Sequence, residues 1–286
     1  MYPEQFEYSR PASLNEAVHL LADHSTKPLA GGQSLIPLLK LRLASVSHLI
    51  DVGRLPELHG VRHAGGKLRV GAATTYAELL DQPAAKVCPI LQECIRDIAD
   101  TQVRNRGTVG GSLAHNDPAA DLPPVALALG GELVISSVAG SRTIPIEDFF
   151  LGPFVTAMEP GELLTDLVLN VPVHGAGTAY SKLRDQASGY PIVGVASVLR
   201  VEGKRISGAR IAITGVGNGT YRATLAEESL QNALVSDTAI ERAAGLALEG
   251  RQVAWDARLP SDYHACMVRL FVRRSVAEAV ARAQTC

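Results

Sequence analysis

Two adjacent glycines separate an apolar strand from a helix start in residues 29–37, which read Leu-Ala-Gly-Gly-Gln-Ser-Leu-Ile-Pro. Residues 27–30 are predicted as the strand, and Ser34 as the cap of a helix over about 35–43 with Pro37 in its first turn. Glycines let a ligand approach backbone N–H groups, and the helix start adds the positive end of its dipole, so the unit is typical of a phosphate site. Taken alone, such a pair is more often only a turn, and it lacks the G-x-G-x-x-G spacing of dinucleotide-binding loops.

A second glycine pair lies in residues 108–112, which read Thr-Val-Gly-Gly-Ser. The surrounding segment 102–121 is rich in glycine and small polar residues and shows no helical or strand period, yet apolar segments on both sides argue against a linker. Thr108 and Ser112 add hydroxyl donors, and two such pairs in one domain favour a diphosphate held between two loops. Asp121 is either an acceptor for sugar hydroxyls or the cap of the helix that follows it.

The pattern of elements changes between Pro172 and Gly177. Before this point, segments of strand and helix length alternate. After it, three antiparallel strands are predicted, with residues 202–204 as the hairpin turn between the last two, and then helices. The strands are predicted at residues 178–184, 193–201 and 205–214, and the helices at 225–234, 238–248 and from Ser261 onward. We therefore expect two domains of mixed helix and strand, residues 1–175 and 176–286.

Size and composition exclude several classes of function. The 286 residues suit two domains, and 47% hydrophobic residues provide material for their cores. Charged residues make up 20% and the net charge is −2, which argues against a nucleic-acid or anionic-membrane surface. Aromatic residues make up only 5%, so any flat ring would be held largely by backbone and aliphatic groups.

Cysteine spacing and targeting signals narrow the range further. Four cysteines lack the close spacing of zinc or iron–sulfur ligands, so no metal site is expected. No Ser–His–Asp or paired-carboxylate arrangement is visible, so no catalytic residues are predicted. The N-terminus lacks the basic and apolar regions of a secretory signal, and no apolar run approaches about 18 residues. A cytoplasmic location is therefore the default expectation, with peripheral association of a larger complex with a membrane left open.

The motifs together resemble the medium, FAD-binding subunit of the molybdenum hydroxylases, a family that includes xanthine dehydrogenase and aerobic carbon monoxide dehydrogenase. The resemblance covers nearly the whole chain and implies an α+β fold. A two-part FAD-binding domain of the PCMH/vanillyl-alcohol-oxidase-like type would occupy residues 1–175. A smaller carbon monoxide dehydrogenase flavoprotein-like domain, with a three-stranded antiparallel sheet and helices, would occupy residues 176–286. The matching segments are residues 6–8, 11–13, 29–37 and 102–111.

The resemblance also implies which residues bind a non-covalent FAD. The FAD diphosphate would lie on two segments, Ala30, Gly31, Gly32, Gln33 and Ser34, and Thr108, Val109, Gly110, Gly111 and Ser112. Asp121 would contact the cofactor, Leu164 would pack near the flavin or adenine, Lys182 would lie near the flavin ring, and Tyr190 would cover one ring face. Gln33 stands where histidine is common in the family, and its amide still offers a donor. Three alternatives stay open for Arg104 and Arg106: they face phosphate, they face a partner subunit, or they lie on the solvent-exposed surface.

The implied function is electron transfer within a larger oxidoreductase. Electrons would leave a substrate at a molybdenum cofactor in a large subunit and pass through two [2Fe-2S] clusters in a small subunit to FAD on this chain. An external acceptor would then take them, with quinone, cytochrome or dioxygen slightly favoured over NAD because no nicotinamide-binding fingerprint is present. We expect a heterohexamer with two copies of each of three subunits. The substrate stays open between carbon monoxide, purines and nicotine-like heteroaromatics.

Two other functions are compatible with the same motifs. A stand-alone FAD oxidoreductase would need a substrate domain with acid–base residues, and the C-terminal region is small and poor in them. A non-redox nucleotide-binding scaffold would bind no flavin, so a flavin spectrum separates it from the other two.

Overall fold

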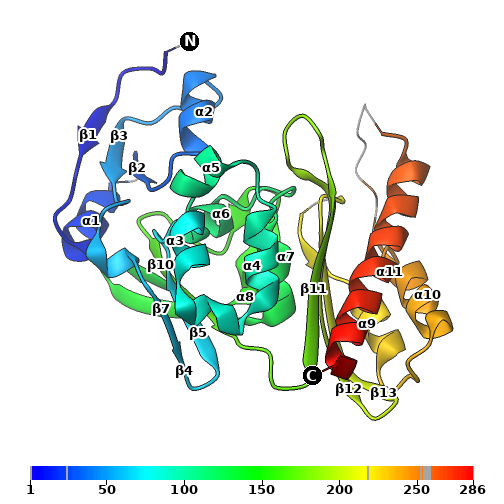
Figure 1. Cartoon of the computed structure of the whole chain (residues 1–286). Helices are drawn as coiled ribbons and strands as arrows, with labels where there is room; N and C mark the ends of the chain where they lie inside the picture. The colour runs from blue at the N-terminus through cyan, green and yellow to red at the C-terminus, as the bar shows by residue number, and fades with distance from the viewer. Residues whose placement is uncertain (1, 24, 218, 252, 254–258, 286) are drawn as a thin grey trace.

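The N-terminal part of the chain begins with a small parallel sheet of order β1-β3-β2 (Figure 1). The computed structural model describes residues 2–285 except 24, 218, 252 and 254–258. The elements are β1 (Glu7–Ser9), α1 (Leu14–Leu21), β2 (Thr26–Leu29), α2 (Leu35–Lys40) and β3 (His48–Asp51). The predicted strand, turn and helix around the first glycine pair are confirmed. The helix ends earlier than expected, at Lys40, and Arg42 just beyond it has a φ of 57°, which an α-helix cannot include.

A larger antiparallel sheet of order β4-β5-β10-β6-β7 forms the second layer. Its strands are β4 (Val61–Ala64), β5 (Lys67–Gly71), β6 (Gly131–Ser137), β7 (Gly140–Pro145) and β10 (Leu163–Asn170). Leu167 lies between Val70 and Leu133 of the neighbouring strands, and all three are fully buried in one apolar core with Ile90 and Val125. The remaining α-helices and strands of this part are α3 (Tyr76–Asp81), α4 (Pro89–Arg96), α5 (Thr101–Arg106), α6 (Val109–His115), α7 (Leu122–Leu129), α8 (Ile146–Phe149), β8 (Phe150–Gly152) and β9 (Val155–Thr156).

Residues 102–121 are not irregular, as their lack of period suggested, because they contain most of α5 and all of α6. The Asp100 carboxylate caps α5 by accepting the Val103 N–H at 2.8 Å. Thr108 Oγ1 caps α6 by accepting the Gly111 N–H at 3.1 Å. Helices of six and seven residues are too short to show a clear period, and caps and tertiary packing stabilise them instead.

The C-terminal part is one antiparallel sheet of order β11-β12-β13-β14, with helices on both faces (Figure 1). α9 and α11 cover one face, while α4 and α7 of the N-terminal part pack on the other. The elements are β11 (Ala176–Arg184), β12 (Pro191–Glu202), β13 (Arg205–Thr214), β14 (Tyr221–Arg222), α9 (Thr224–Leu230), α10 (Asp237–Leu246) and α11 (Ser261–Thr285).

The sheet departs from the prediction in one strand. The three predicted strands and the turn at Gly203, whose φ is 61°, are confirmed. The fourth strand, β14, was missed because two residues carry no period, and its place is set by pairing with Ala212 and Ile213. Among the described helices, none is both long and apolar enough to cross a membrane.

Candidate functional site

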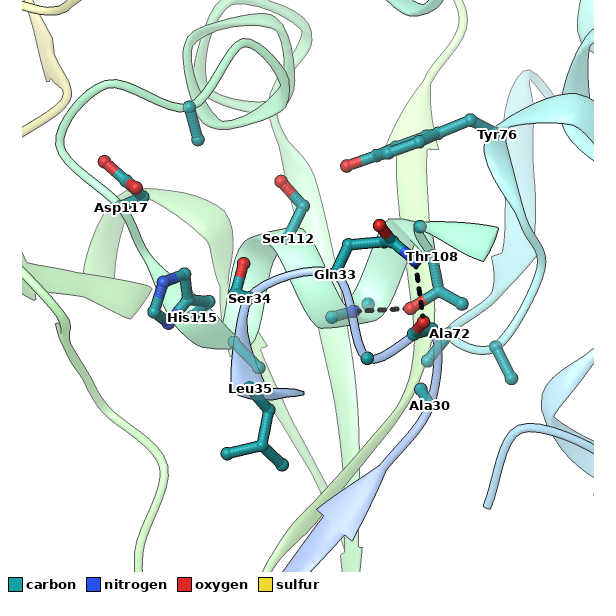
Figure 2. Close-up of a pocket in the computed structure, with 18 of the residues that line it drawn as sticks. Ala30, Gln33, Ser34, Leu35, Ala72, Tyr76, Thr108, Ser112, His115 and Asp117 are labelled. Atoms are coloured by element: carbon teal, nitrogen blue, oxygen red, sulfur yellow. Dashed lines mark hydrogen bonds between the residues drawn. The ribbon is translucent and has the colours of Figure 1, made fainter. Parts of the chain in front are cut away.

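A cavity of about 530 Å³ opens where the first glycine segment meets α5, α6 and the loop before β12 (Figure 2). Its size suits a small-molecule or cofactor site. Of the predicted site residues, all except Val109 and Lys182 line it. The tertiary structure thus brings together the two glycine segments, Asp121, Leu164 and Tyr190, which are widely separated in the sequence.

The first glycine segment presents unused backbone donors to this cavity. Within the described residues, none of the backbone N–H groups of residues 30–35 donates a hydrogen bond. Gly32 has a φ of +74°, and a side chain at Gly31 would collide with the Arg106 carbonyl oxygen at 2.1 Å. Ser34 precedes α2 without capping it through its side chain. A row of free N–H groups at a helix start fits a phosphate or diphosphate.

The second glycine segment differs from the first. The N–H groups of Val109 and Gly110 donate to the carbonyl oxygens of Thr74 and Ala72 at 3.1 and 2.8 Å. Those of Gly111 and Ser112 donate to Thr108. It is therefore the first turn of α6 rather than a second open loop, and it offers the cavity side-chain hydroxyls instead of free N–H groups.

Close packing explains the first glycine of this second pair. A Cβ atom at Gly110 would lie 2.4 Å from the Ala72 Cβ, so only glycine lets α6 approach the end of β5. Val109 is fully buried beneath the cavity wall and holds the helix in the apolar core. The glycine pair thus positions the helix start, and Thr108 and Ser112 supply the polar atoms.

Asp121 lies at the boundary between the two parts of the chain and accepts from two residues of β11. Tyr180 Oη donates to Asp121 Oδ1 at 2.6 Å, and Lys182 Nζ lies 2.8 and 3.0 Å from the two carboxylate oxygens. Burial raises the pKa of Asp121 to about 6, although Lys182 and Tyr180 act in the opposite direction. Asp121 occupies the N-cap position of α7, as the alternative expected, but its side chain makes no capping hydrogen bond there.

Lys182 does not line the cavity, in contrast to the expected place beside a flavin ring. Its ammonium group is almost fully buried and also donates to the Asp97 carbonyl oxygen at 2.9 Å. Lys182 therefore acts on the cavity through Asp121. The sequence could not show these contacts, because Lys182, Asp121 and Asp97 are far apart in the chain.

Tyr190 stands at the cavity on a loop with dense internal hydrogen bonding. Asp185 Oδ1 accepts from the N–H groups of Ala187 and Ser188 at 2.9 and 2.8 Å. Ser188 Oγ accepts the Tyr190 N–H at 3.3 Å, and Gly189 packs against Ala99 across the domain boundary. Tyr190 is half exposed, with 45% of the residue's surface accessible, so it is not fully used in packing.

Beyond the predicted site residues, the lining of the cavity includes the polar side chains of Tyr76, His115 and Asp117. In Figure 2 the Tyr76 hydroxyl points toward Ser112. Burial raises the pKa of Tyr76 and lowers that of His115, so the phenol and the imidazole are both neutral near pH 7. No local signal marks Tyr76, since its place at the cavity depends on the contact of its ring with Gly107.

Arg104 does not face the cavity as a phosphate ligand. Its guanidinium donates to the Ile98 carbonyl oxygen at 2.7 Å and to Thr101 at 3.3 Å. It therefore stabilises the turn between α4 and α5. Arg106 contacts the first glycine segment through its backbone carbonyl oxygen, which lies next to Gly31.

Comparison with known proteins matches both parts of the chain. Residues 4–173 match the model of the FAD binding domain in molybdopterin dehydrogenase, and residues 178–279 match that of the CO dehydrogenase flavoprotein C-terminal domain. The carbon monoxide dehydrogenase medium chain of Hydrogenophaga pseudoflava is 38% identical over 99% of both chains. The nicotine 6-hydroxylase medium subunit of Paenarthrobacter nicotinovorans is 37% identical over 96% of this chain and 97% of that one. A solved structure of carbon monoxide dehydrogenase from Hydrogenophaga pseudoflava superposes with a TM-score of 0.95 at 39% identity, covering 99% of each chain.

Proposed function

The chain belongs to the FAD-binding medium subunits of the molybdenum-dependent dehydrogenases, and we propose that it carries electrons from a partner's iron–sulfur clusters to an external acceptor. It is an FAD-binding subunit of an oxidoreductase. FAD, when bound, supplies the redox chemistry, and the residues of this chain hold, orient and shield it.

The row of free N–H groups over residues 30–35 is the observation that carries this proposal. A diphosphate placed there would also meet the hydroxyls of Thr108 and Ser112 on the same cavity. Leu164 would supply an apolar wall, and Tyr190 would cover one face of the flavin ring. Asp121 would accept a hydrogen bond from the cofactor at the end of the cavity nearest β11.

The cavity favours electron transfer over substrate chemistry on this chain. Its buried carboxylate, Asp121, is already bound by Tyr180 and Lys182, which leaves it poorly placed as a general base. Relatives of nearly equal identity are named for carbon monoxide and for nicotine, at 38% and 37%. We infer that substrate choice resides in another subunit of the complex, so the stand-alone oxidoreductase is the weaker alternative.

The proposed partners are a large subunit with the molybdenum cofactor and a small subunit with two [2Fe-2S] clusters. The family membership supports a multi-subunit complex. We propose two copies of each of the three subunits. Light scattering on the co-expressed, purified complex measures this stoichiometry, and a mass equal to one copy of each subunit would exclude the heterohexamer.

FAD release from the complex tests the proposed cofactor site. We expect wild-type complex to yield FAD in amounts stoichiometric with this chain after acid treatment. Ser34→Glu places a carboxylate at the start of α2, where it repels a diphosphate but suits the helix dipole. We expect this variant to assemble with little FAD. Thr238→Glu, on the exposed first turn of α10, adds the same charge away from the cavity and should keep its FAD.

Two results would count against the proposed function. Wild-type complex that holds no flavin after reconstitution would favour the nucleotide-binding scaffold. Full FAD content in Ser34→Glu would show that the diphosphate lies elsewhere than on residues 30–35.

A further inference from the structure

Three alternate residues of β11 form a row of donors that crosses the domain boundary. Tyr180 and Lys182 both reach Asp121, and Arg184 donates to the Ala99 carbonyl oxygen at 2.6 Å. Alternate residues of a strand share one face, so the pleat of β11 aims all three at α4, the turn after it and the start of α7.

Lys182 and Asp121 form an ion pair that is almost fully shielded from water. The side chain of Lys182 is 1% exposed and that of Asp121 is 7% exposed. A buried ion pair is costly to form and is poor support for stability, so its presence on a cavity wall calls for another explanation. Within the described residues, the side chains that donate to the Asp121 carboxylate are only Tyr180 and Lys182.

The charge of Asp121 acts on the same end of the cavity as Tyr190. Burial is the main cause that raises the pKa of the Tyr190 and Tyr76 hydroxyls at the cavity, and the charge of Asp121 adds to it. Asp97 and Cys94 also interact electrostatically with the Asp121 carboxylate. A ring covered by Tyr190 would therefore experience both charges of the Asp121–Lys182 pair, which offset each other in large part when both partners are ionised.

We propose that Tyr180 and Lys182 are positioning residues that hold Asp121 on the cavity wall and balance its charge, so that the pair sets the reduction potential of the bound FAD. This rests on the proposed function, since it requires FAD in the cavity. Two-electron reduction with uptake of one proton leaves the flavin with one more negative charge. An unbalanced positive charge nearby therefore favours the reduced flavin, and an unbalanced negative charge disfavours it.

A double-mutant cycle on the purified complex tests the charge balance. Asp121→Asn leaves the buried Lys182 cation unpaired, still held by the Asp97 carbonyl oxygen. We expect the ratio of reduced to oxidised flavin at a fixed potential to rise roughly tenfold, which is about 30 mV for a two-electron couple. Asp121→Asn combined with Lys182→Met removes both charges and should return the potential to near the wild-type value. The readout is the flavin absorbance during a spectroelectrochemical titration.

Arg210→Met is the matched control for loosening of the domain boundary. Arg210 donates to the carbonyl oxygens of Leu127 and Ala128 at 2.7 and 2.8 Å, so it also joins the two parts, but it does not line the cavity. We expect its flavin potential to match that of wild type. A shift in Arg210→Met as large as that in Asp121→Asn would overturn the proposal, because loosening would then explain both.

Other outcomes are equally decisive. An unshifted potential in Asp121→Asn, or a double variant that stays as shifted as the single one, refutes the charge balance while leaving FAD binding intact. Absence of FAD from wild-type complex instead refutes the proposed function. If Asp121→Asn binds FAD too weakly to titrate, Lys182→Met is measured at alkaline pH, where the unpaired carboxylate should lower the potential. No change there also refutes the proposal.

Discussion

Replacement of Gly31 by alanine should weaken FAD binding without unfolding the chain. The added Cβ would lie 2.1 Å from the Arg106 carbonyl oxygen, whereas ordinary contacts begin at 3.4 Å. The first glycine segment must therefore move by about 1.3 Å away from α5. Overpacking of this kind costs about 1–3 kcal/mol. Because the displaced segment carries the free N–H groups, we expect that cost to appear mainly as a five- to 150-fold loss of FAD affinity, at about 1.4 kcal/mol per factor of ten.

The measurement is a titration of flavin-depleted complex with FAD, followed by the quenching of flavin fluorescence. Gly245→Ala is the matched control, because a Cβ atom there meets nothing within 4 Å and Gly245 lies inside α10. Alanine is the better helix former, so the control should bind FAD as wild type does and be slightly more stable.

One outcome would refute the reasoning about the glycine contact. If Gly31→Ala binds FAD with wild-type affinity and its circular dichroism is unchanged, the close approach of the two segments is not needed for the site. A loss of affinity in Gly245→Ala would show that the assay reports general disturbance of the complex.

Three other predictions concern Tyr190 at the cavity, the buried carboxylate of Asp121, and Gly177 in the C-terminal part. Tyr190→Ala should weaken FAD binding and change the flavin absorbance band, since Tyr190 lines the cavity and is proposed to cover the ring, whereas Tyr190→Phe should keep both near wild type. The pKa of Asp121 is raised by burial from 3.8 to about 6, so its native state binds the proton more tightly than the unfolded chain. The free energy of unfolding should therefore fall as pH rises from about 4 to about 6, and Asp121→Asn should flatten this slope in urea titrations. Gly177→Ala should lower the Tm strongly, because a Cβ there would lie 1.8 Å from the Ala279 carbonyl oxygen of α11.

Each of these has an outcome that contradicts it. Equal FAD affinity in Tyr190→Ala and Tyr190→Phe would remove the ring from the site. A slope in Asp121→Asn as steep as that of wild type would place the titration on another group. A Tm of Gly177→Ala close to wild type would mean that α11 can retreat from β11 at little cost.

The outline of the fold and the first half of the site could be predicted from local patterns. The strand, glycine pair and helix of residues 29–37 depend on interactions between neighbours in the chain, as does the hairpin at Gly203. The long strands β11 to β13 could be predicted as well, because a strand pattern in the sequence becomes visible only over several residues. The helices α5 and α6 and the strand β14 are too short for that and were missed or taken as irregular.

Which contacts each predicted site residue makes was decided by the tertiary structure. The second glycine pair looks like the first in sequence, yet the N–H groups of residues 109–112 donate to Ala72, Thr74 and Thr108. The hydrogen bonds to Ala72 and Thr74 form only because α6 packs against the end of β5. Lys182 lies behind Asp121 instead of beside the cavity for the same kind of reason. The amino-acid sequence by itself determined which segments are strands, turns and helix starts, since these follow from neighbouring residues. Which donors stay free and which charges meet depends on contacts between distant segments, and those exist only once the two sheets and their helices have packed.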